Sequence, residues 1–598
     1  MFEPKRKANR SGTFPQAFWG TENGEQSGVL AVARSVSYTP GTNVKGEVSG
    51  ANWTFMLPSM ELDHVVCLGV PPEDVIPVLA RVGRRVTLLC SLHQQVDVGG
   101  LRLRYQPLSL RPLVLDVWNK LPLEDHTVDL LVFTDRKVLE QFMRHADWFD
   151  EVQRVLKPDG LVYFEFGSWK LRLFNRFRSH PGTLRHFWIT PLVGRMKTAV
   201  PSSDTAVERF CVRNALCATH LKRRPLASFE RALYEKAYVR ARMRRFSALW
   251  TPAENATWLD GPPAYLCRLA EAEGVDIAKH RWALVATGDY SSRKILFYLF
   301  PPDAHGQTLQ PEYLVKLTRA PQFNYRLENE VHALRALQHA KVPGAHVLPR
   351  IVFSGHHSGL ALAAQTAVPG EPFNRRTEAT PDCPYARAAV NWLVDLGQAT
   401  VNTEEATAAE VAQILESLVT RLADIYRLTP QHLAFLEQQL AVLAASSQPF
   451  PLVFQHGDPG PWNVLVRPDG TPVFIDWEAA EPLGMPLWDI WYFWRSFSVR
   501  VARKKGVRDR LEAFLQEFLS ASELSIRIVA SVRRYCEQVG VPREWVSPLF
   551  YLCWAHRALK EATRLSSHRL ERGHYINLLR LCIDQRNMPT LRRMFLEQ

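Results

Sequence analysis

The residues best suited to chemistry lie in one stretch of this 598-residue chain, QHGDPGPWNVLV, and in the run VFIDWE that follows it. Asp458 and Asn463 are five residues apart, and Asp476 ends the apolar run PVFID. Transfer of a phosphoryl group from a nucleotide needs a carboxylate that orients and deprotonates the accepting hydroxyl. It also needs oxygen ligands for magnesium. One such Asp or Asn usually caps a helix, but the whole ordered set predicts phosphoryl transfer.

The pattern resembles the aminoglycoside phosphotransferase and choline kinase family, which has a protein-kinase-like fold. The catalytic loop of that family reads HGDxxxxN, and its metal-binding Asp ends a strand in a motif like IDWE. The resemblance implies that Asp458 is the catalytic base, that Asn463 and Asp476 hold Mg²⁺, and that ATP is the phosphate donor. Asp489, in GMPLWDIW, matches a family Asp that braces the catalytic loop.

The preceding segment holds, in order, the residues that a nucleotide-binding lobe needs. YLVKLTR places Lys316 in an apolar strand, where it would pair with the nucleotide phosphates. The helical pattern RLENEVHALRAL offers Glu330 as the partner of this lysine, with Glu328 as the competing candidate. The run LALAAQTAVPGEPF matches the family's strand and hinge, so three backbone positions would meet the adenine: Thr366, Ala367 and Val368.

The turn expected to cover the phosphates departs from the protein-kinase pattern GxGxxG. It reads ATGDYSSRK and holds Gly288 alone. The family resembled often uses serine in this turn. We therefore assign Ser291 and Ser292 to phosphate contacts through their hydroxyls and backbone amides. The resemblance covers residues 280–595.

The hydrophobic pattern predicts the elements that would position these residues. Four short apolar runs occupy 63–69, 84–90, 128–134 and 160–167, with helical patterns between them. Strands that alternate with helices predict an α/β domain with a mostly parallel sheet. RWALVATGDYSSRKILFYLF predicts a hairpin, and the chain has a mainly helical pattern after residue 385.

The first α/β domain resembles class I methyltransferases that use S-adenosylmethionine. LPLEDHTVDLLVF (121–133) matches the family's strand lead-in, and EVQRVLKPDGLVYFEFG (151–167) matches its RVLKPGG turn. The first loop, CLGVPPED, keeps Gly69 but has Pro71 and Pro72 where the family has glycines. Those glycines let the backbone approach the cofactor.

The second strand also departs from the family. It ends in Cys90 and Ser91, where the family has an acid that binds the ribose hydroxyls. Asp125 is an acid that would lie near an adenine, although a solvated turn residue is the simpler interpretation. We predict a degenerate domain that does not methylate. Gly69 is the cofactor contact that remains if S-adenosylmethionine binds.

The predicted fold class is α/β plus α+β, a Rossmann-like methyltransferase-type domain followed by a bilobal protein-kinase-like domain. Its C-terminal lobe is mainly helical and would contain the acceptor-binding helices. The expected parts are an irregular lead-in (1–50), the methyltransferase-like domain (51–245), a linker (246–280), the kinase-like N-lobe (281–368) and the C-lobe (369–598).

The net charge of +13 is concentrated in one segment. Residues 170–245 hold 18 basic against four acidic residues, so the rest of the chain sums to −1. A basic segment of this kind favours a polyanionic partner such as anionic lipid, glycan or nucleic acid. Three residues four apart would lie on one apolar helical face suited to a membrane interface: Trp169, Leu173 and Phe177. The alternative is that the aromatic residues are core and the charges are solvated.

Composition excludes several classes of protein. A hydrophobic fraction of 46% and a charged fraction of 22% are those of a folded globular chain. The nine cysteines show no CxxC pair, and no apolar run is long enough to span a bilayer. We expect a cytoplasmic protein, with the basic segment as the part that would meet the inner face of the membrane.

These features predict an ATP-dependent phosphotransferase that acts on a hydroxyl of a small-molecule, sugar or lipid-linked acceptor. One alternative is a bifunctional kinase and methyltransferase that modifies a glycan or glycolipid. Another is a scaffold that binds nucleic acid or membrane through the basic segment. The acceptor and the oligomeric state are not readable from the sequence.

Overall fold

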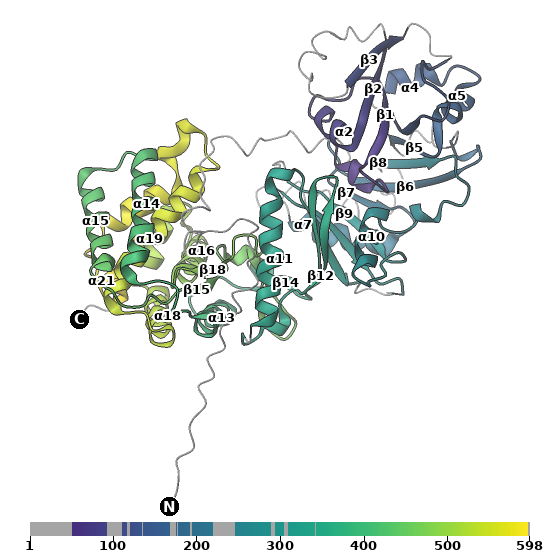
Figure 1. The fold of residues 1–598 in the computed structure, drawn as a ribbon. Helices are drawn as coiled ribbons and strands as arrows, with labels where there is room; N and C mark the ends of the chain where they lie inside the picture. Colours follow the sequence, from purple (N-terminus) through teal and green to yellow (C-terminus); the bar gives the residue numbers. More distant parts are fainter. Residues whose placement is uncertain are drawn as a thin grey trace, which may run out of the picture. The chain divides into compact units, whose positions relative to one another are not determined.

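The computed structural model describes residues 51–91, 110–115, 120–133, 136–167, 175, 177–191, 194–218, 245–288, 293–303, 309–340 and 342–595. The chain divides into two compact units (Figure 1). The first comprises the described residues up to Val331 together with Pro349–Ala367. The second comprises His332–Leu348 and the described residues from Val368 onward.

The N-terminal strands confirm the predicted parallel sheet. Five strands are parallel in the order β3-β2-β1-β4-β5: β1 (Leu62–Leu68), β2 (Gly83–Ser91), β3 (Leu110–Leu115), β4 (Val128–Phe133) and β5 (Leu156–Gly167). Helix α2 (Ile76–Val82) joins β1 to β2, and α4 (Arg136–Phe142) and α5 (Trp148–Val155) precede β5. The strand order reverses between β1 and β4. In sheets of this kind, ligands bind beyond the carboxyl ends of the strands at such a reversal.

Antiparallel strands extend this sheet beyond β5. They follow in the order β8 (Arg245–Thr251), β6 (Thr183–Thr190), β7 (Thr198–Pro201), β9 (Arg281–Val285), β10 (Ile295–Phe300), β11 (Tyr313–Leu317), β13 (Leu360–Thr366) and β12 (Ile351–His357). The described strands of the first unit thus form one 13-stranded sheet. The junction is made by β7 and β9, where Thr198 pairs with Val285 and Ala199 with Leu284. The methyltransferase-type strands and the strand that carries Lys316 therefore share one sheet.

Residues 246–280, which we expected to be a linker, are an integral part of this unit. Strand β8 lies between β5 and β6 and pairs with both of them. Helix α10 (Ala264–Ala272) packs against β12, while α7 (Thr205–Ala218) packs against β7 and β9. The Pro, Gly and Asn residues indicated a linker because they break local structure. Pairing with two distant strands outweighs that local signal.

One hydrophobic core cluster lies under both parts of the sheet. It contains Phe55 and Val65 from the methyltransferase-type part, and Phe297 and Val315 from β10 and β11. The short 3₁₀ turn Asn52–Met56 is buried along its whole length. The two parts of the first unit therefore share their core.

A buried arginine connects this turn to the end of β11. Arg319 is 1% exposed, and its guanidinium donates to Asn52 Oδ1 (2.5 Å) and to the carbonyl oxygens of Arg293 (2.8 Å) and Thr287 (3.4 Å). Asn52 Nδ2 in turn donates to the carbonyl oxygen of Met196 (2.5 Å). Burial of a guanidinium is tolerated because its N–H groups have partners.

The second unit is mainly helical, as predicted. Its helices are α12 (Phe373–Arg376), α13 (Pro384–Thr400), α14 (Ala408–Ile425), α15 (Pro430–Ala444), α16 (Trp488–Lys504), α17 (Arg510–Phe514), α18 (Glu523–Val539), α19 (Arg543–Ala562), α20 (His574–Asp584) and α21 (Pro589–Met594). Helix α11 (Asn324–His339) begins in the first unit and ends in the second. The small sheets are β14 (Glu371–Pro372), β16 (Val464–Val466) and β17 (Pro472–Phe474), and β15 (Val453–Gln455) with β18 (Glu481–Gly484).

Part of the basic segment 170–245 lies within the described residues. Three of its aromatic side chains are buried in core: Phe177, Phe187 and Trp188. Arg185 and Arg245 form ion pairs with Asp260 and Glu165. Trp169 and Leu173 of the predicted interfacial helix lie outside the described residues. A polyanionic partner of this segment stays a prediction.

None of the helices in the described part of the chain combines the length and the apolar character needed to cross a bilayer.

Candidate active site

The loop that carries Asp458 follows strand β15 and is held by the start of α16. The Asp489 carboxylate accepts hydrogen bonds from the backbone N–H groups of His456 (2.6 Å) and Gly457 (3.1 Å). Gly457 has φ +76°, and a Cβ there would lie 1.8 Å from the carbonyl oxygen of Ala479. Only glycine fits such a position. The HGD sequence is therefore a conformational requirement of this loop as well as a chemical one.

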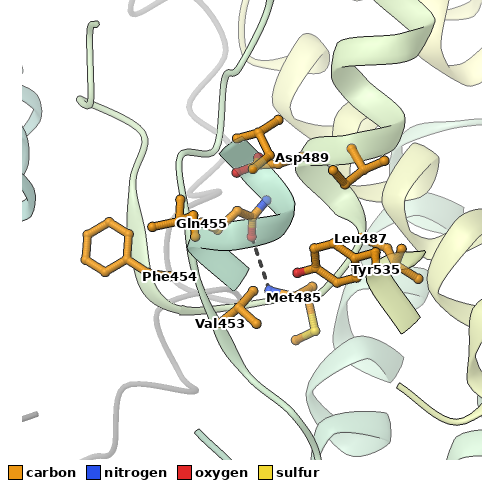
Figure 2. A pocket seen from close by; sticks show the side chains of 10 residues that line it. Val453, Phe454, Gln455, Met485, Leu487, Asp489 and Tyr535 are labelled. Carbon is orange, nitrogen blue, oxygen red and sulfur yellow. Dashed lines mark hydrogen bonds between the residues drawn. The ribbon is translucent and has the colours of Figure 1, made fainter. Parts of the chain in front are cut away.

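Asp489 lies in the packed interior behind the loop. Figure 2 shows the side chains that line a small cavity there, among them Asp489, Gln455 and Tyr535. Gln455 Oε1 accepts a hydrogen bond from the Met485 N–H (3.1 Å), the dashed line in Figure 2. Burial raises the pKa of Asp489. The nearby His456 ring and the backbone N–H groups of His456 and Gly457 oppose that rise. Asp489 therefore acts as a brace, the role its motif implied.

His456 is a structural residue of the loop. It is fully buried, and its ring lies 4.4 Å from the Trp477 ring. Nδ1 accepts the Asp458 N–H (3.3 Å), and Nε2 lies 3.2 Å from the carbonyl oxygen of Ile475. Burial lowers the pKa of His456, so the neutral ring with a proton on Nε2 satisfies both contacts. The ring thus ties the loop to the segment that leads to Asp476.

The structure brings Asn463 onto Asp458. A 3₁₀ turn, Pro461–Asn463, places the Asn463 Nδ2 atom 2.9 Å from the Asp458 carbonyl oxygen and 3.2 Å from its Oδ2. The Asp458 side chain is 34% exposed, whereas Asn463 is buried. The carboxylate is therefore oriented by an amide yet open to an incoming hydroxyl. The other atom of that amide, Oδ1, is the one that would coordinate a cation.

Asp476 lies two residues after strand β17. Its neighbour Ile475 pairs with Asn463, because the Ile475 N–H donates to the Asn463 carbonyl oxygen (2.9 Å). Asp476 has φ +67°, a strained conformation for a residue with a side chain, of the kind that clusters at active sites. In the part of the chain that the structure describes, no group of three or more His, Cys, Asp or Glu could hold a metal alone. One carboxylate and one amide oxygen fit Mg²⁺ when nucleotide phosphates and water complete its shell.

Arg557 joins this site although no sequence motif marked it. From α19, its Nη2 donates to the Gly457 carbonyl oxygen (2.8 Å), and its Nη1 lies 4.0 Å from Asp458 Oδ1. The guanidinium carbon lies 3.5 Å from the centre of the Tyr492 ring. The side chain is buried. A lone Arg within a helix carries no signal in sequence, and only the fold brings it to the loop.

In the first unit, Lys316 and Glu330 form a buried ion pair between β11 and α11. A second lysine, Lys294, also contacts this carboxylate, with Nζ 2.7 Å from Glu330 Oε2. Glu328 instead contacts His356 (2.9 Å). The structure thus brings Glu330, and not Glu328, to Lys316. Sequence analysis did not single out Lys294, which follows the turn predicted to cover the phosphates.

The predicted hinge begins at the end of β13. The Thr366 and Ala367 N–H groups donate to the carbonyl oxygens of Arg350 (2.9 Å) and Glu312 (2.8 Å). Contacts of Thr366, Ala367 and Val368 with adenine would therefore use other backbone groups of this segment. Ser291 and Ser292 lie outside the described residues.

The carboxyl ends of β1 and β2 carry the other predicted cofactor contact. Gly69 has φ +96°, and its N–H donates to the Leu89 carbonyl oxygen (2.8 Å). Cys90 is fully buried, and burial raises the pKa of its thiol to about 11. Asp125 forms an ion pair with Arg154 (2.5 Å). This partner within the protein agrees with the interpretation of Asp125 as a turn residue.

Two family models match the sequence. The phosphotransferase enzyme family matches residues 299–525, and the methyltransferase domain matches residues 66–164. The C-terminal region is phosphotransferase-like, and the N-terminal region is methyltransferase-like. Within the first match lie the residues of the predicted catalytic set, Lys316, Asp458, Asn463 and Asp476. No curated protein matches the chain.

Several solved structures are similar to this chain at low identity. A choline/ethanolamine kinase family protein from Mesorhizobium loti is 16% identical, covers 51% of this chain and 88% of its own, and has a TM-score of 0.30. An aminoglycoside phosphotransferase from Streptomyces rimosus, in complex with ADP and streptomycin, is 19% identical with coverages of 50% and 97% and a TM-score of 0.29. WbdD, solved with a kinase inhibitor, is 13% identical with coverages of 80% and 84% and a TM-score of 0.22.

The described ends of β1 and β2 offer few of the groups that would hold S-adenosylmethionine. The Gly69 N–H is already bonded within the protein. At the end of β2, Cys90 presents a buried, protonated thiol instead of an exposed carboxylate that could accept from ribose hydroxyls. The Pro71 and Pro72 residues that follow Gly69 have no N–H to donate. We therefore derive no methyl transfer from this region.

Proposed function

We propose that the protein transfers the γ-phosphoryl group of ATP to a hydroxyl of a small-molecule, sugar or lipid-linked acceptor. The observation that supports this most is the Asp458–Asn463 contact on a loop braced by Asp489. This contact fixes the orientation of the Asp458 carboxylate, which is still partly exposed to solvent. An active phosphotransferase needs this arrangement, and a domain that only binds does not.

In the proposed reaction, Asp458 accepts the hydroxyl proton as the acceptor oxygen forms a bond to the γ-phosphorus. The bond between that phosphorus and the bridging oxygen breaks, and ADP leaves. Asn463 fixes the Asp458 carboxylate during proton transfer. Magnesium, when bound by Asn463 and Asp476, would neutralise the phosphate charge.

On the nucleotide side, we assign Lys316 to the phosphates. Glu330 orients its ammonium, and the pair is buried, so the charge acts in a medium of low dielectric. We also assign the hinge backbone Thr366–Val368 to the adenine, and Ser291 and Ser292 to the phosphates.

The test is a screen of a metabolite pool for an ATP-dependent mass gain of one phosphate. Asp458→Asn removes the base while keeping the shape, and general-base catalysis contributes about 10²- to 10⁴-fold, so we expect loss of the product. Asp469→Asn is the matched control, because that side chain is exposed, with 55% of its surface open to solvent. If Asp458→Asn forms the product at the wild-type rate, the proposal is wrong.

For the methyltransferase-like region we propose a role without methylation. Calorimetry with S-adenosylmethionine tests it on the full chain. Binding at micromolar concentration would contradict the misfit at Gly69 and Cys90 and return the bifunctional alternative.

A further inference from the structure

One large aromatic side chain of the catalytic loop is exposed. Trp462, which lies between Asp458 and Asn463, is 50% exposed. The neighbouring Trp477 and Trp488 are at most 1% exposed. A half-exposed indole forgoes much of the burial that usually stabilises tryptophan, and this one belongs to the loop that carries Asp458.

The exposed indole nonetheless has packing partners. A Cβ at Gly460 would lie 2.3 Å from the Trp462 ring, so the ring packs closely on the backbone of Gly460. The Tyr492 ring meets it edge-on, at 6.1 Å and 87°. Pro461 precedes it and limits the backbone. Trp462 therefore offers a rigid apolar surface without being buried itself.

A chain of contacts leads from this indole to the catalytic carboxylate. Tyr492 meets Trp462 on one side, while the Arg557 guanidinium stacks 3.5 Å from the Tyr492 ring centre. Arg557 in turn lies 4.0 Å from Asp458. Two buried side chains, Tyr492 and Arg557, thus link the exposed indole to the partly exposed Asp458 carboxylate.

Two further groups near Arg557 add a donor and an acceptor. Lys560 lies one turn beyond Arg557 on α19, and burial together with Arg557 lowers the pKa of Lys560 to about 8, while Glu481 and Asp458 oppose that fall. The Glu481 Oε2 atom is buried and has no hydrogen-bond partner among the described residues. Such an oxygen is costly unless a ligand or water donates to it.

We infer that Trp462 is the stacking surface of an acceptor subsite that takes a sugar ring without net positive charge. The inference rests on the proposed function and names its substrate class. A flat apolar face with nearby donors and acceptors suits a ring that has one apolar face and hydroxyls at its edge. Arg557 lies 4.0 Å from Asp458 and offsets part of the negative charge that would attract a polycationic acceptor.

The experiment uses the full chain, MgATP and three sets of acceptors. They are neutral and acidic monosaccharides with their oligomers, acyclic amino alcohols such as choline, and an aminoglycoside. We expect transfer to a sugar. With that sugar, Trp462→Ala should raise its KM about tenfold while kcat and the KM of MgATP stay within threefold, as expected for loss of one stacking contact. Trp462→Phe keeps a ring and should restore most of the affinity.

Tyr325→Ala is the matched control, since that aromatic side chain is 60% exposed and has no place in the catalytic loop. An unchanged acceptor KM in Trp462→Ala would overturn the inference, as would transfer only to acyclic or polycationic acceptors. A rise in the KM of MgATP instead would place the nucleotide on the indole and also overturn it. The proposed function fails separately, if no acceptor gains an Asp458-dependent phosphate.

Discussion

The contact between Asn52 and Arg319 tests whether the two parts of the first unit stabilise each other. Asn52 lies before β1, in the methyltransferase-type part, and Arg319 lies two residues after β11. Asn52→Ala removes the Oδ1 atom that accepts from the buried guanidinium, and also the amide that donates to Met196. Because Arg319 is 1% exposed, water cannot replace the lost acceptor.

The expected cost follows from this burial. A hydrogen bond to a charged group contributes about 1.5–3 kcal/mol, and the unsatisfied buried donor adds to its loss, so we expect a loss of about 3 kcal/mol. In a unit of this size such a loss lowers the midpoint of thermal unfolding by about 6 °C. Asn52→Asp keeps an acceptor for Arg319 and should cost much less.

The assay is calorimetric unfolding of the full chain, with Gln322→Ala as a control at an exposed amide of the same unit. A double-mutant cycle with Arg319→Leu should give a coupling of about 2 kcal/mol, because the acceptor matters little once the guanidinium is gone. An Asn52→Ala midpoint within 1 °C of wild type, or a coupling near zero, would refute the reasoning.

Three further predictions concern the two sites. Gly457→Ala should lower the unfolding midpoint and abolish transfer, because its Cβ would meet the Ala479 oxygen; a wild-type melting curve would contradict this. An unfolded lysine titrates near 10.5 and Lys560 at about 8, so the unfolded chain holds more protons between these pH values. The stability of the wild type relative to Lys560→Met should therefore rise from pH 8 to 10. If the urea midpoints of the two proteins differ by the same amount at every pH, this prediction is wrong. By calorimetry, Glu330→Gln should weaken MgATP binding about tenfold and Glu328→Gln should not; the reverse order would favour Glu328.

Much of the fold was predictable because its signals are local. Short apolar runs separated by helical patterns marked β1, β2, β4 and β5, and the hairpin of β9 and β10 was legible in the same way. The linker prediction over 246–280 was wrong because β8 is defined by its partners and not by its own composition. Strands β7 and β9 join the two parts of the sheet through two residue pairs, and no local sequence pattern predicts that pairing.

The sequence by itself determined the order of chemical groups, since the spacing from Asp458 to Asn463 and on to Asp476 is a property of one short stretch. The tertiary structure decided which other groups face them. Arg557 reaches the loop from 100 residues away, and Trp462 is exposed only because the surrounding packing leaves it so. A helix residue or a tryptophan looks the same in sequence whether it is core or site. Long-range packing makes that choice, because burial and partner atoms depend on elements far apart in the chain.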